Sequence, residues 1–268
     1  MPPPLRLAVG GATGRMGQTL ARLAAADPSL QMVGGIAPAG SAAADAGADD
    51  GYPVVRVPEA AADLLRQADV LLDFSAPELL PRLAALHPEA LAGRALVVGT
   101  TGLGAEALAL LDELARRAPV LHAANFSVGV NLLAALVEQA TRALGEAFDV
   151  EIVEAHHRRK ADAPSGTALQ LGAAVARARG VPLDSARRDG RSGQSGERPR
   201  GEIGFHAVRG GDVVGEHRVL FLGERERLEL AHLAGDRAVF AEGALRAARW
   251  LHGRPAGRYT MRQVLGLG

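Results

Sequence analysis

Short runs of apolar residues alternate with amphipathic stretches along the first half of the chain. The apolar runs have the length of buried strands, and the stretches between them place hydrophobic residues at helical spacing. The pattern predicts strands at residues 5–9, 31–37, 70–74, 95–99 and 120–123, and helices at residues 18–26, 77–86 and 128–144. Strands that alternate with helices in this way predict a parallel sheet with helices on both faces.

The pattern changes after about residue 149, where polar and apolar positions begin to alternate. This alternation predicts antiparallel strands with one solvated face at residues 149–155, 203–208, 215–221 and 227–232. Residues 187–201, rich in Gly, Ser and Arg, are expected to form a mobile loop. Residues 237–251 have a strong helical pattern, after which only a turn or two of further structure is expected. A second, mostly β, domain is therefore predicted.

The charge and residue usage favour small molecules, or further copies of the chain, as partners. The 268 residues include 30 basic and 30 acidic side chains, so no net charge draws the protein to nucleic acid or to an anionic membrane. The absence of cysteine excludes disulfides, thiolate catalysis and zinc–thiolate sites. The chain starts almost directly with a predicted strand, without a leader pattern or a segment that is apolar enough to span a bilayer, so a cytoplasmic location is expected.

Three glycines are spaced between the first predicted strand and the first predicted helix. Gly11, Gly14 and Gly17 would let backbone N–H groups approach a pyrophosphate at the helix N-terminus, although a glycine turn without a ligand has the same pattern. The usual dinucleotide-binding fingerprint, G-x-G-x-x-G, has a second glycine that is absent here. Residues 34–40 also offer neither the carboxylate nor the arginine that would select a ribose or its phosphate, so the choice between NADH and NADPH stays open.

Two further loops follow predicted strands, at residues 99–102 and 123–127. Ligands of open α/β sheets lie at the carboxyl ends of the strands, so these loops are candidates for ligand binding. Helix capping by Thr101 or Ser127 is the alternative explanation for their polar residues. Together with the glycine loop, the two segments are expected to converge on one crevice.

The most specific segment is Glu154–Leu169, which contains Lys160, the only lysine of the chain. Basic and titratable groups are followed by Pro-Ser-Gly-Thr at a helix start, whose N–H groups and hydroxyls form a cradle for a carboxylate. A metal site at His156 and His157 is an alternative, but neighbours on a strand point to opposite faces and no third ligand is evident. A solvated basic loop beside an ordinary helix cap is the other alternative.

Six phrases of the sequence together resemble the dihydrodipicolinate reductase family, in the order and over nearly the whole length of that family. They are Gly11–Gly17 (GATGRMG), Asp73–Glu78 (DFSAPE), Gly99–Gly102 (GTTG), Ala123–Asn131 (AANFSVGVN), Glu154–Ala168 (EAHHRRKADAPSGTA) and Val214–His217 (VGEH). The fifth phrase is highly specific, whereas the glycine loop is common to many families.

The resemblance implies transfer of a hydride from NADH or NADPH to a cyclic dicarboxylate, giving tetrahydrodipicolinate in lysine and diaminopimelate biosynthesis. It implies that His156 gives or takes a proton, that Lys160 donates the proton that completes the reduction, and that no metal takes part. Substrate-binding positions are implied at His157, Ser165, Gly166 and Thr167. Cofactor-binding positions are implied at Gly11, Ala12, Thr13, Gly14, Arg15, Met16, Gly99, Thr100, Thr101, Ala123, Ala124, Asn125 and Phe126.

The expected fold is α/β, with a Rossmann-type dinucleotide-binding domain at residues 1–126 and 236–268. Residues 127–235 are expected to form an inserted α+β domain that binds substrate and assembles a homotetramer, as is typical of the family. Cofactor and substrate would then bind to different domains, which predicts that the domains close for hydride transfer. Two alternatives remain: a related dehydrogenase such as an aspartate dehydrogenase, which has no obvious need of the full histidine-lysine phrase, and a non-catalytic dinucleotide sensor, which would not need Lys160.

Overall fold

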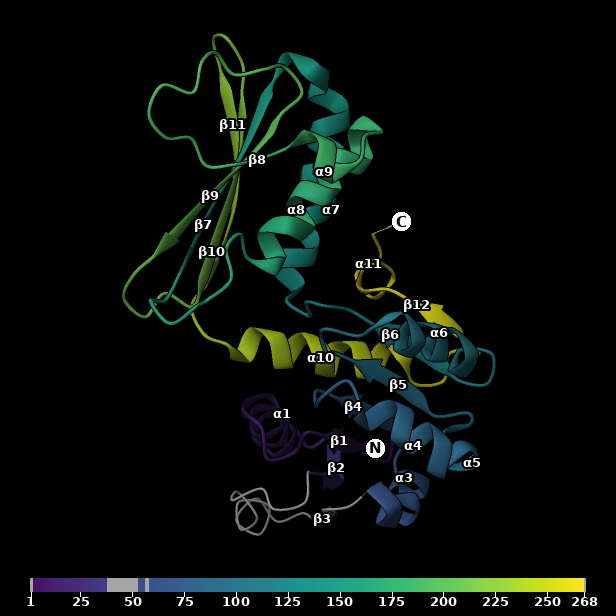
Figure 1. Ribbon diagram of the computed structural model, residues 1–268. Helices are drawn as coiled ribbons and strands as arrows, with labels where there is room; N and C mark the ends of the chain where they lie inside the picture. The colour runs from purple at the N-terminus through teal and green to yellow at the C-terminus, as the bar shows by residue number, and fades with distance from the viewer. Residues whose placement is uncertain (1, 38–52, 56–57, 268) are drawn as a thin grey trace. The chain divides into compact units, whose positions relative to one another are not determined.

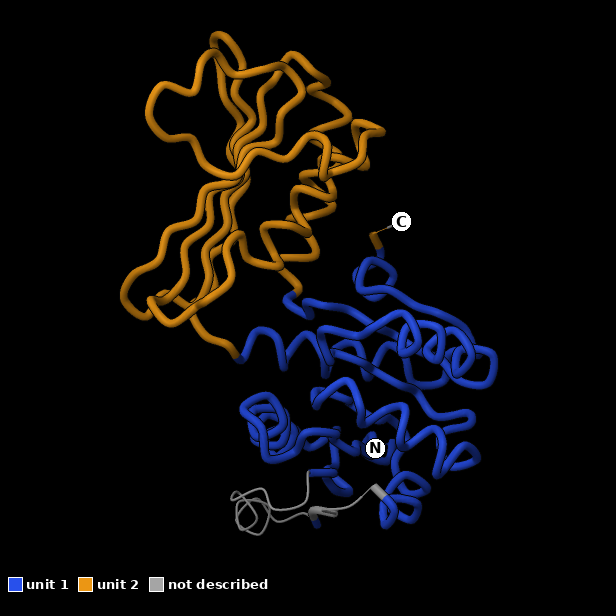
Figure 2. Tube along the Cα trace, viewed as in Figure 1, with its two compact units in different colours: residues 1–127, 238–266, 268 blue, residues 128–237, 267 orange. Residues whose placement is uncertain are grey.

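The computed structural model describes residues 2–37, 53–55 and 58–267, and the chain divides into two compact units. Unit 1 comprises residues 1–127 and 238–266, and unit 2 comprises residues 128–237 (Figure 2). The chain therefore passes between the units twice, after Ser127 and after Arg237.

Unit 1 is built on a sheet of seven parallel strands in the order β12-β6-β5-β4-β1-β2-β3 (Figure 1). The strands are β1 (Leu5–Gly10), β2 (Leu30–Ile36), β3 (Val54–Val55), β4 (Val70–Asp73), β5 (Ala95–Val98), β6 (Pro119–His122) and β12 (Gly257–Tyr259). The order of the first six is that of a doubly wound, Rossmann-type sheet, in which the winding reverses between β1 and β4. All seven carboxyl ends lie along one edge.

Helices cover both faces of this sheet. They are α1 (Arg15–Ala25), α3 (Ala62–Gln67), α4 (Leu79–Leu86), α5 (Pro88–Leu91), α6 (Ala105–Leu114), α10 (Ala238–Leu251) and α11 (Met261–Val264), with a short 3₁₀ turn at Pro58–Ala60. Leu7 and Val9 of β1 pack in the core beneath α1 and α10, whereas Ala8 between them packs in the core beneath α3 to α6. The same burial on both faces explains why the central strands β4 and β5 are buried throughout.

The C-terminal helix α10 is part of unit 1 although the whole of unit 2 precedes it in the sequence. Six of its alanine and leucine residues lie in the core that α1 also covers, namely Ala241, Ala244, Leu245, Ala247, Ala248 and Leu251. Gly243 allows a close approach, because a Cβ atom there would lie 1.8 Å from the carbonyl oxygen of Phe126. An ion pair between Arg249 and Asp27 joins α10 to the segment after α1.

Unit 2 contains a five-stranded sheet in the order β11-β10-β7-β9-β8. Its elements are α7 (Val128–Leu144), a 3₁₀ turn (Gly145–Ala147), β7 (Asp149–His156), α8 (Gly166–Arg179), α9 (Leu183–Ala186), β8 (Arg187–Asp189), β9 (Ile203–Arg209), β10 (Gly215–Leu222) and β11 (Arg227–Ala234). Helices α7 and α8 lie along one face of the sheet and enclose a core with Val150, Ile152 and Phe221 (Figure 1). None of the helices among the described residues is long and apolar enough to cross a membrane.

The predicted parallel sheet with helices on both faces is confirmed, but three predictions about the second half are wrong. The sheet of unit 2 is mixed, since β9 runs parallel to β7 and to β8. The connection from β7 to β9 includes α8, and such a crossover returns the chain in the same direction. Residues 187–189 form β8 within the predicted loop, and β12 adds an unforeseen seventh strand to unit 1.

Helix starts were predicted less well than helix ends. Helix α1 begins at Arg15, three residues before the predicted start, and α4 begins at Leu79, two residues after it. In both cases the first turn is set by the preceding loop, Gly14 acting as the N-cap of α1 and Glu78 as that of α4. Periodicity gives no signal for such short boundary segments.

Candidate active site

The glycine loop after β1 leads directly into α1 and has room only for glycine at two positions. Gly11 has φ +78°, and a Cβ atom there would lie 2.6 Å from the carbonyl oxygen of Phe74. A Cβ atom at Gly17 would lie 2.3 Å from the carbonyl oxygen of Gly11. The first-turn N–H groups of α1 have no acceptor within the helix, and its N-cap, Gly14, has no side chain to bind them. The residues present therefore fit an anionic pyrophosphate at this helix start.

The loops after β4, β5 and β6 meet around the ring of Phe74. A Cβ atom at Gly99 would lie 2.0 Å from that ring, so the ring packs directly on the backbone of Gly99. The rings of Phe74 and Phe126 are 5.3 Å apart, and the N–H of Gly99 donates to the carbonyl oxygen of Asp73 at 2.8 Å. The structure thus brings the three predicted loops to one edge of the sheet, with the loop after β4 between them.

The predicted cofactor residues differ in what they offer to a ligand. The side chains of Ala12, Thr100 and Phe126 are buried and belong to the interior of unit 1, whereas Arg15, Thr101 and Ala124 are exposed. Three of the other predicted positions are glycines: Gly14 is exposed, and Gly11 and Gly99 are half-buried. The rest carry half-buried side chains, namely Thr13, Met16, Ala123 and Asn125. The Oδ1 atom of Asn125 accepts from the N–H of Ser127 at 2.8 Å, which organises the turn into α7.

In unit 2, His156 ends strand β7 and is held by a buried carboxylate. Glu154 lies two residues earlier, on the same face of the strand, and its Oε2 atom is 2.6 Å from Nδ1 of His156. Arg209 of the neighbouring strand β9 donates to both carboxylate oxygens at 2.7 Å. Burial alone would raise the pKa of Glu154, but the hydrogen bonds from Arg209, His156 and the N–H of Ser165 outweigh it and hold that pKa below its usual value. Glu154 is therefore ionised at neutral pH, so Nδ1 of His156 carries a proton and Nε2 is the nitrogen left for chemistry. No Cβ atom crowds Nε2, because residue 215 is glycine.

The segment after His156 leads into helix α8 through Ser165. The hydroxyl of Ser165 accepts from the N–H of Ala168 at 3.2 Å and lies 3.0 Å from Nε2 of His217, and the N–H of Ser165 donates to Glu154 at 3.0 Å. Burial and the neighbouring His156 lower the pKa of His217 to about 4, so this histidine is neutral at pH 7. The helix itself offers no acceptor to the N–H of Gly166. Apart from its chain neighbours and the backbone of its own helix, no described residue lies within 4 Å of a Cβ atom built there. The start of α8 is thus open to a ligand.

His157 and Lys160 are each in direct contact with a charged side chain. Arg237 donates to Nε2 of His157 at 3.0 Å, and burial together with this guanidinium lowers the pKa of His157. Because a guanidinium only donates, the proton of the neutral His157 is on Nδ1, which is buried and has no hydrogen-bond partner among the described residues. The Nζ atom of Lys160 lies 2.8 Å from Oδ1 of Asp162, and its side chain is 21% exposed.

The charge of this region favours an anionic ligand with more than one carboxylate. The segment between β7 and α8 carries three cationic side chains, Arg158, Arg159 and Lys160. Two further arginines bind its neighbours, since Arg209 pairs with Glu154 and Arg237 donates to His157. Within the described part of the chain, no group of three or more metal-ligating side chains occurs that would hold a metal ion. His156 and His157 have separate neighbours, Glu154 and Arg237.

Sequence reasoning missed four residues of this arrangement: Glu154, Arg209, His217 and Arg237. Glu154 and His217 occur in the phrases quoted above, and the spacing of Glu154 to His156 places them on one face of a strand. Arg209 gave no signal, because its contact depends on the pairing of β9 with β7. Arg237 gave none either, since 80 residues separate it from His157.

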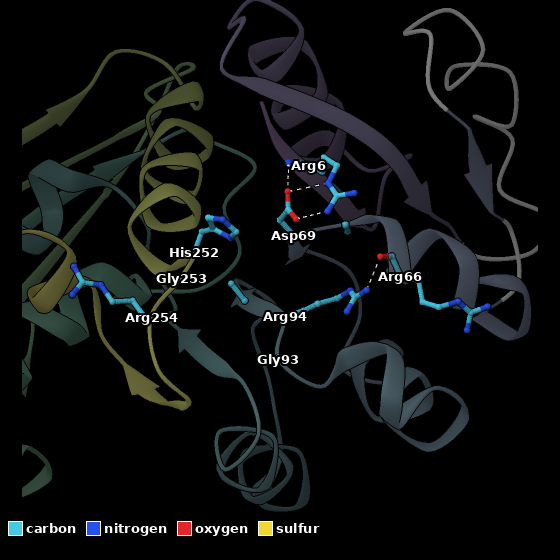
Figure 3. Close-up of a pocket in the computed structure, with 10 residues that line it drawn as sticks. Arg6, Arg66, Asp69, Gly93, Arg94, His252, Gly253 and Arg254 are labelled. Carbon is cyan, nitrogen blue, oxygen red and sulfur yellow. Dashed lines mark hydrogen bonds and ion pairs between the residues drawn. The ribbon is translucent and has the colours of Figure 1, made fainter. Parts of the chain in front are cut away.

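A cavity of about 360 Å³ lies at the opposite, amino-terminal edge of the unit 1 sheet and contains none of the predicted site residues (Figure 3). Its polar groups are largely paired with one another. Arg6 donates to both oxygens of Asp69, at 3.1 and 2.7 Å, and Arg94 donates to the carbonyl oxygens of Leu65 and Arg66. The first contact connects the starts of β1 and β4, and the second connects the start of β5 to helix α3, so both have a structural explanation.

Unit 1 has the sheet order, the glycine turn and the open helix start of a dinucleotide-binding domain, and unit 2 holds a histidine, a lysine and a second open helix start. The two together define a pyridine-nucleotide-dependent oxidoreductase. Two family profiles match, "Dihydrodipicolinate reductase, N-terminus" over residues 5–126 and "Dihydrodipicolinate reductase, C-terminus" over residues 129–265. The chain belongs to the dihydrodipicolinate reductase family.

Curated relatives and solved structures agree with this assignment. The chain is 50% identical to the 4-hydroxy-tetrahydrodipicolinate reductase of Methylocella silvestris over 269 residues, covering 98% of each chain. It is 48% identical to that of Thiobacillus denitrificans over 266 residues, covering 98% of this chain and 99% of the relative. The dipicolinate-bound dihydrodipicolinate reductase from Paenisporosarcina sp. TG-14 shares its fold, with a TM-score of 0.76 and 24% identity over 96% of this chain and 97% of the other.

Proposed function

We propose that this chain reduces 4-hydroxy-tetrahydrodipicolinate to tetrahydrodipicolinate with NADH or NADPH, in the biosynthesis of diaminopimelate and lysine. The observation that carries the proposal is the arrangement in unit 2, where His156 is oriented by Glu154 beside the open, capped start of α8. Relatives with nearly 50% identity over almost the full length carry the name of this activity.

The dinucleotide is assigned to unit 1. We assign cofactor binding to residues 1–126 and 236–268, and substrate binding and tetramer formation to residues 127–235. The start of α1 would hold the pyrophosphate, with contacts from Gly11 to Met16, Gly99 to Thr101 and Ala123 to Phe126. A bound reduced nicotinamide supplies the hydride.

The substrate is a cyclic dicarboxylate, and the start of α8 would bind one of its carboxylates. Ser165, Gly166 and Thr167 surround this helix start, and Ser165 is already fixed by its bonds to Ala168 and His217. His157, kept neutral beside Arg237, is the proposed neighbour of this carboxylate. The excess of cationic side chains would neutralise the dianion.

The 4-hydroxy substrate loses one molecule of water, and the ring gains a hydride from the nicotinamide and a proton. Each turnover therefore releases water and consumes one proton, which the protein must deliver. Lys160 is the proposed donor, since its ammonium also neutralises the substrate. His156 is the proposed partner in proton transfer, because Glu154 fixes its ring and leaves Nε2 for the substrate. Asp162, whose pKa is lowered by its hydrogen bond from Lys160, stays ionised and holds Nζ of Lys160 at 2.8 Å.

The proposed cofactor preference is dual. Residues 34–40 supply neither a repelling carboxylate nor a binding arginine; of this stretch, the structure describes residues 34–37. The catalytic efficiencies with NADH and NADPH are expected to lie within about tenfold of each other, or about 1.4 kcal/mol. An Ala37→Glu variant is a poor test, because the side chain of Ala37 is only 3% exposed. The measurement that decides is the ratio of the two catalytic efficiencies in the wild-type protein. A preference for either dinucleotide beyond about a hundredfold contradicts dual use.

The proposed assembly is a homotetramer formed through the sheet of unit 2, and the proposed location is the cytoplasm. The strands of this sheet carry exposed apolar side chains, among them Val208 at 53%, Leu228 at 40% and Leu233 at 56% exposure. An exposed sheet of this kind is suited to pairing with another copy. Sedimentation velocity tests the assembly, and a monomer at micromolar concentration contradicts it.

The test of the proposed reaction is consumption of NADH or NADPH by the purified chain, followed by absorbance. Because the substrate is labile, it is generated in the cuvette by condensation of pyruvate with aspartate semialdehyde. Oxidation that requires both precursors and the condensing enzyme supports the proposal. Oxidation that is absent, or that proceeds with aspartate semialdehyde alone, contradicts it.

A further inference from the structure

Asp73, the last residue of β4, is a buried carboxyl group at the carboxyl edge of the unit 1 sheet. Its side chain is 1% exposed. The Oδ1 atom accepts from the N–H of Ser75 at 3.2 Å and from the Ser75 hydroxyl, whereas Oδ2 has no hydrogen-bond partner among the described residues. Buried polar atoms almost always have a partner, so an unpartnered oxygen here requires an explanation.

The surroundings of Asp73 connect it to the loops assigned to the dinucleotide. A Cβ atom at Gly10 would lie 2.9 Å from Oδ1, so the last residue of β1 has no side chain where the carboxyl group lies. Thr100 donates its hydroxyl to the carbonyl oxygen of Asp73 at 3.3 Å and accepts from the N–H of Ser75 at 3.2 Å. A Cβ atom at Gly11 would lie 3.0 Å from the Cα atom of Ser75. The position of Asp73 thus affects both the glycine loop and the loop after β5.

Burial raises the pKa of Asp73, and the hydrogen bonds from the hydroxyl and the N–H of Ser75 oppose this shift without cancelling it. On the elements next to β4, the charged side chains at the loop ends are Arg15 of α1 and Glu78 before α4, and both are exposed. His122 of β6 bonds to the backbone of Thr100, and burial lowers its pKa, so this histidine is neutral at pH 7. No ion pair of Asp73 occurs among the described side chains, so burial favours its uncharged form.

We propose that Asp73 is a positioning residue for the dinucleotide, which acts as an uncharged carboxyl group and holds the loops after β1, β4 and β5 in the binding conformation. The inference rests on the proposed function, since it takes these loops as the dinucleotide site. An anionic pyrophosphate near an ionised Asp73 would be repelled, and the ionised carboxylate would also leave a charged Oδ2 without a partner.

The proposal predicts a particular dependence of dinucleotide affinity on pH. If the complex with NADH requires a protonated Asp73, binding of NADH takes up a proton wherever Asp73 is ionised in the free protein. The dissociation constant for NADH then rises at pH values above the pKa that Asp73 has in the free protein, by up to about tenfold per pH unit. NADH is the suitable probe because its pyrophosphate does not titrate in this range.

The experiment is calorimetric titration of the whole protein with NADH between about pH 5.5 and pH 9. The amide of Asp73→Asn cannot ionise, so this variant should bind NADH as tightly as wild type at low pH and show no rise in dissociation constant at high pH. Asp69→Asn is the matched control, because Asp69 lies just before the same strand, at the opposite edge, and is paired with Arg6. Its binding should follow the wild-type pH profile.

A second variant makes an opposite prediction and does not alter the carboxyl group itself. Ser75→Ala removes a hydroxyl donor that favours the ionised form of Asp73, so its affinity for NADH should persist to higher pH than in wild type. Thermal unfolding midpoints of all variants show whether each is folded.

Identical pH profiles in wild type and Asp73→Asn would overturn the proposal, as would a Ser75→Ala profile shifted to lower pH. Loss of NADH binding by a folded Asp73→Asn at every pH would also overturn it, because the amide preserves the uncharged state. A wild-type chain that binds no NADH at any pH would contradict the proposed function itself, and with it this inference.

Discussion

Glu154→Gln is the substitution that most sharply separates the orientation of His156 from the stability of unit 2. The carboxylate of Glu154 is 1% exposed and receives hydrogen bonds from His156, from both Nη atoms of Arg209 and from the N–H of Ser165. Glutamine keeps the shape but replaces one acceptor oxygen with an NH₂ donor. One of the present donors therefore loses its acceptor, and the negative charge that favours a proton on Nδ1 of His156 disappears.

The expected effects follow from this geometry. Breaking a fully buried ion pair costs about 3–5 kcal/mol, but Arg209 is 20% exposed, so solvent screening reduces the expected loss of unfolding free energy to about 2–4 kcal/mol. Loss of the residue that orients a functional histidine typically lowers activity by about 10–100-fold. The turnover number should fall by that factor, equivalent to about 1.4–2.7 kcal/mol, while the dissociation constant for NADH stays unchanged.

The chain offers a matched control in Glu151→Gln, on the same strand. Glu151 is also buried and is bound by Arg191 at 3.0 Å, Arg198 at 2.8 Å and His206 at 2.7 Å. Urea unfolding should show a similar loss of stability in both variants, whereas steady-state kinetics should show a lower turnover number only for Glu154→Gln. Equal turnover numbers in the two variants would refute the reasoning that Glu154 positions His156.

Three further substitutions in unit 2 test other parts of the account. The pKa of His217 is about 4 in the folded chain and about 6.5 in the unfolded chain, so the unfolded state binds the proton first and stability falls as the pH drops from about 6.5 towards 4. This histidine should account for about 2 kcal/mol of the unfolding free energy that is lost between about pH 7.5 and pH 5. Measured by urea unfolding at both pH values, the loss in His217→Gln should be smaller than in wild type by this amount. Gly166→Ala should leave stability unchanged, or raise it by up to about 1 kcal/mol, yet increase the KM for substrate; an unchanged KM counts against ligand approach at Gly166. Thr167→Val should raise the same KM with little change in kcat, and a fall in kcat alone would argue against its role as a carboxylate donor.

The fold of unit 1 was largely predictable because its strands are buried on both faces. Leu7, Ala8 and Val9 pack alternately into the two cores, which leaves a continuous apolar run that the sequence displays directly. Strand β12 was not predictable, because Gly257–Tyr259 has too few residues to show a period, and only its pairing with β6 makes it a strand. The direction of β9 was missed for a related reason, since alternation reports which face is buried and not which neighbour a strand has.

The site was predictable where its residues are neighbours in the sequence and not where they meet through folding. His156, Lys160 and Ser165 lie within one short segment, so a resemblance to known proteins located them together. Arg209 and His217 reach the same region from β9 and β10, through sheet pairings that no local pattern encodes. Asp73 was noticed only as part of a phrase, because its burial depends on the absence of a side chain at Gly10.

The most direct test of the account is the turnover number of Lys160→Ala, measured beside Arg159→Ala, which removes a neighbouring exposed cation. If Lys160 delivers the proton, its loss should lower turnover by about 10²–10⁴-fold, with NADH affinity and the thermal unfolding midpoint almost unchanged. Arg159→Ala should retain most of the wild-type turnover. A Lys160→Ala variant that reduces the substrate at the wild-type rate would contradict the assignment of this lysine and of the active site around it.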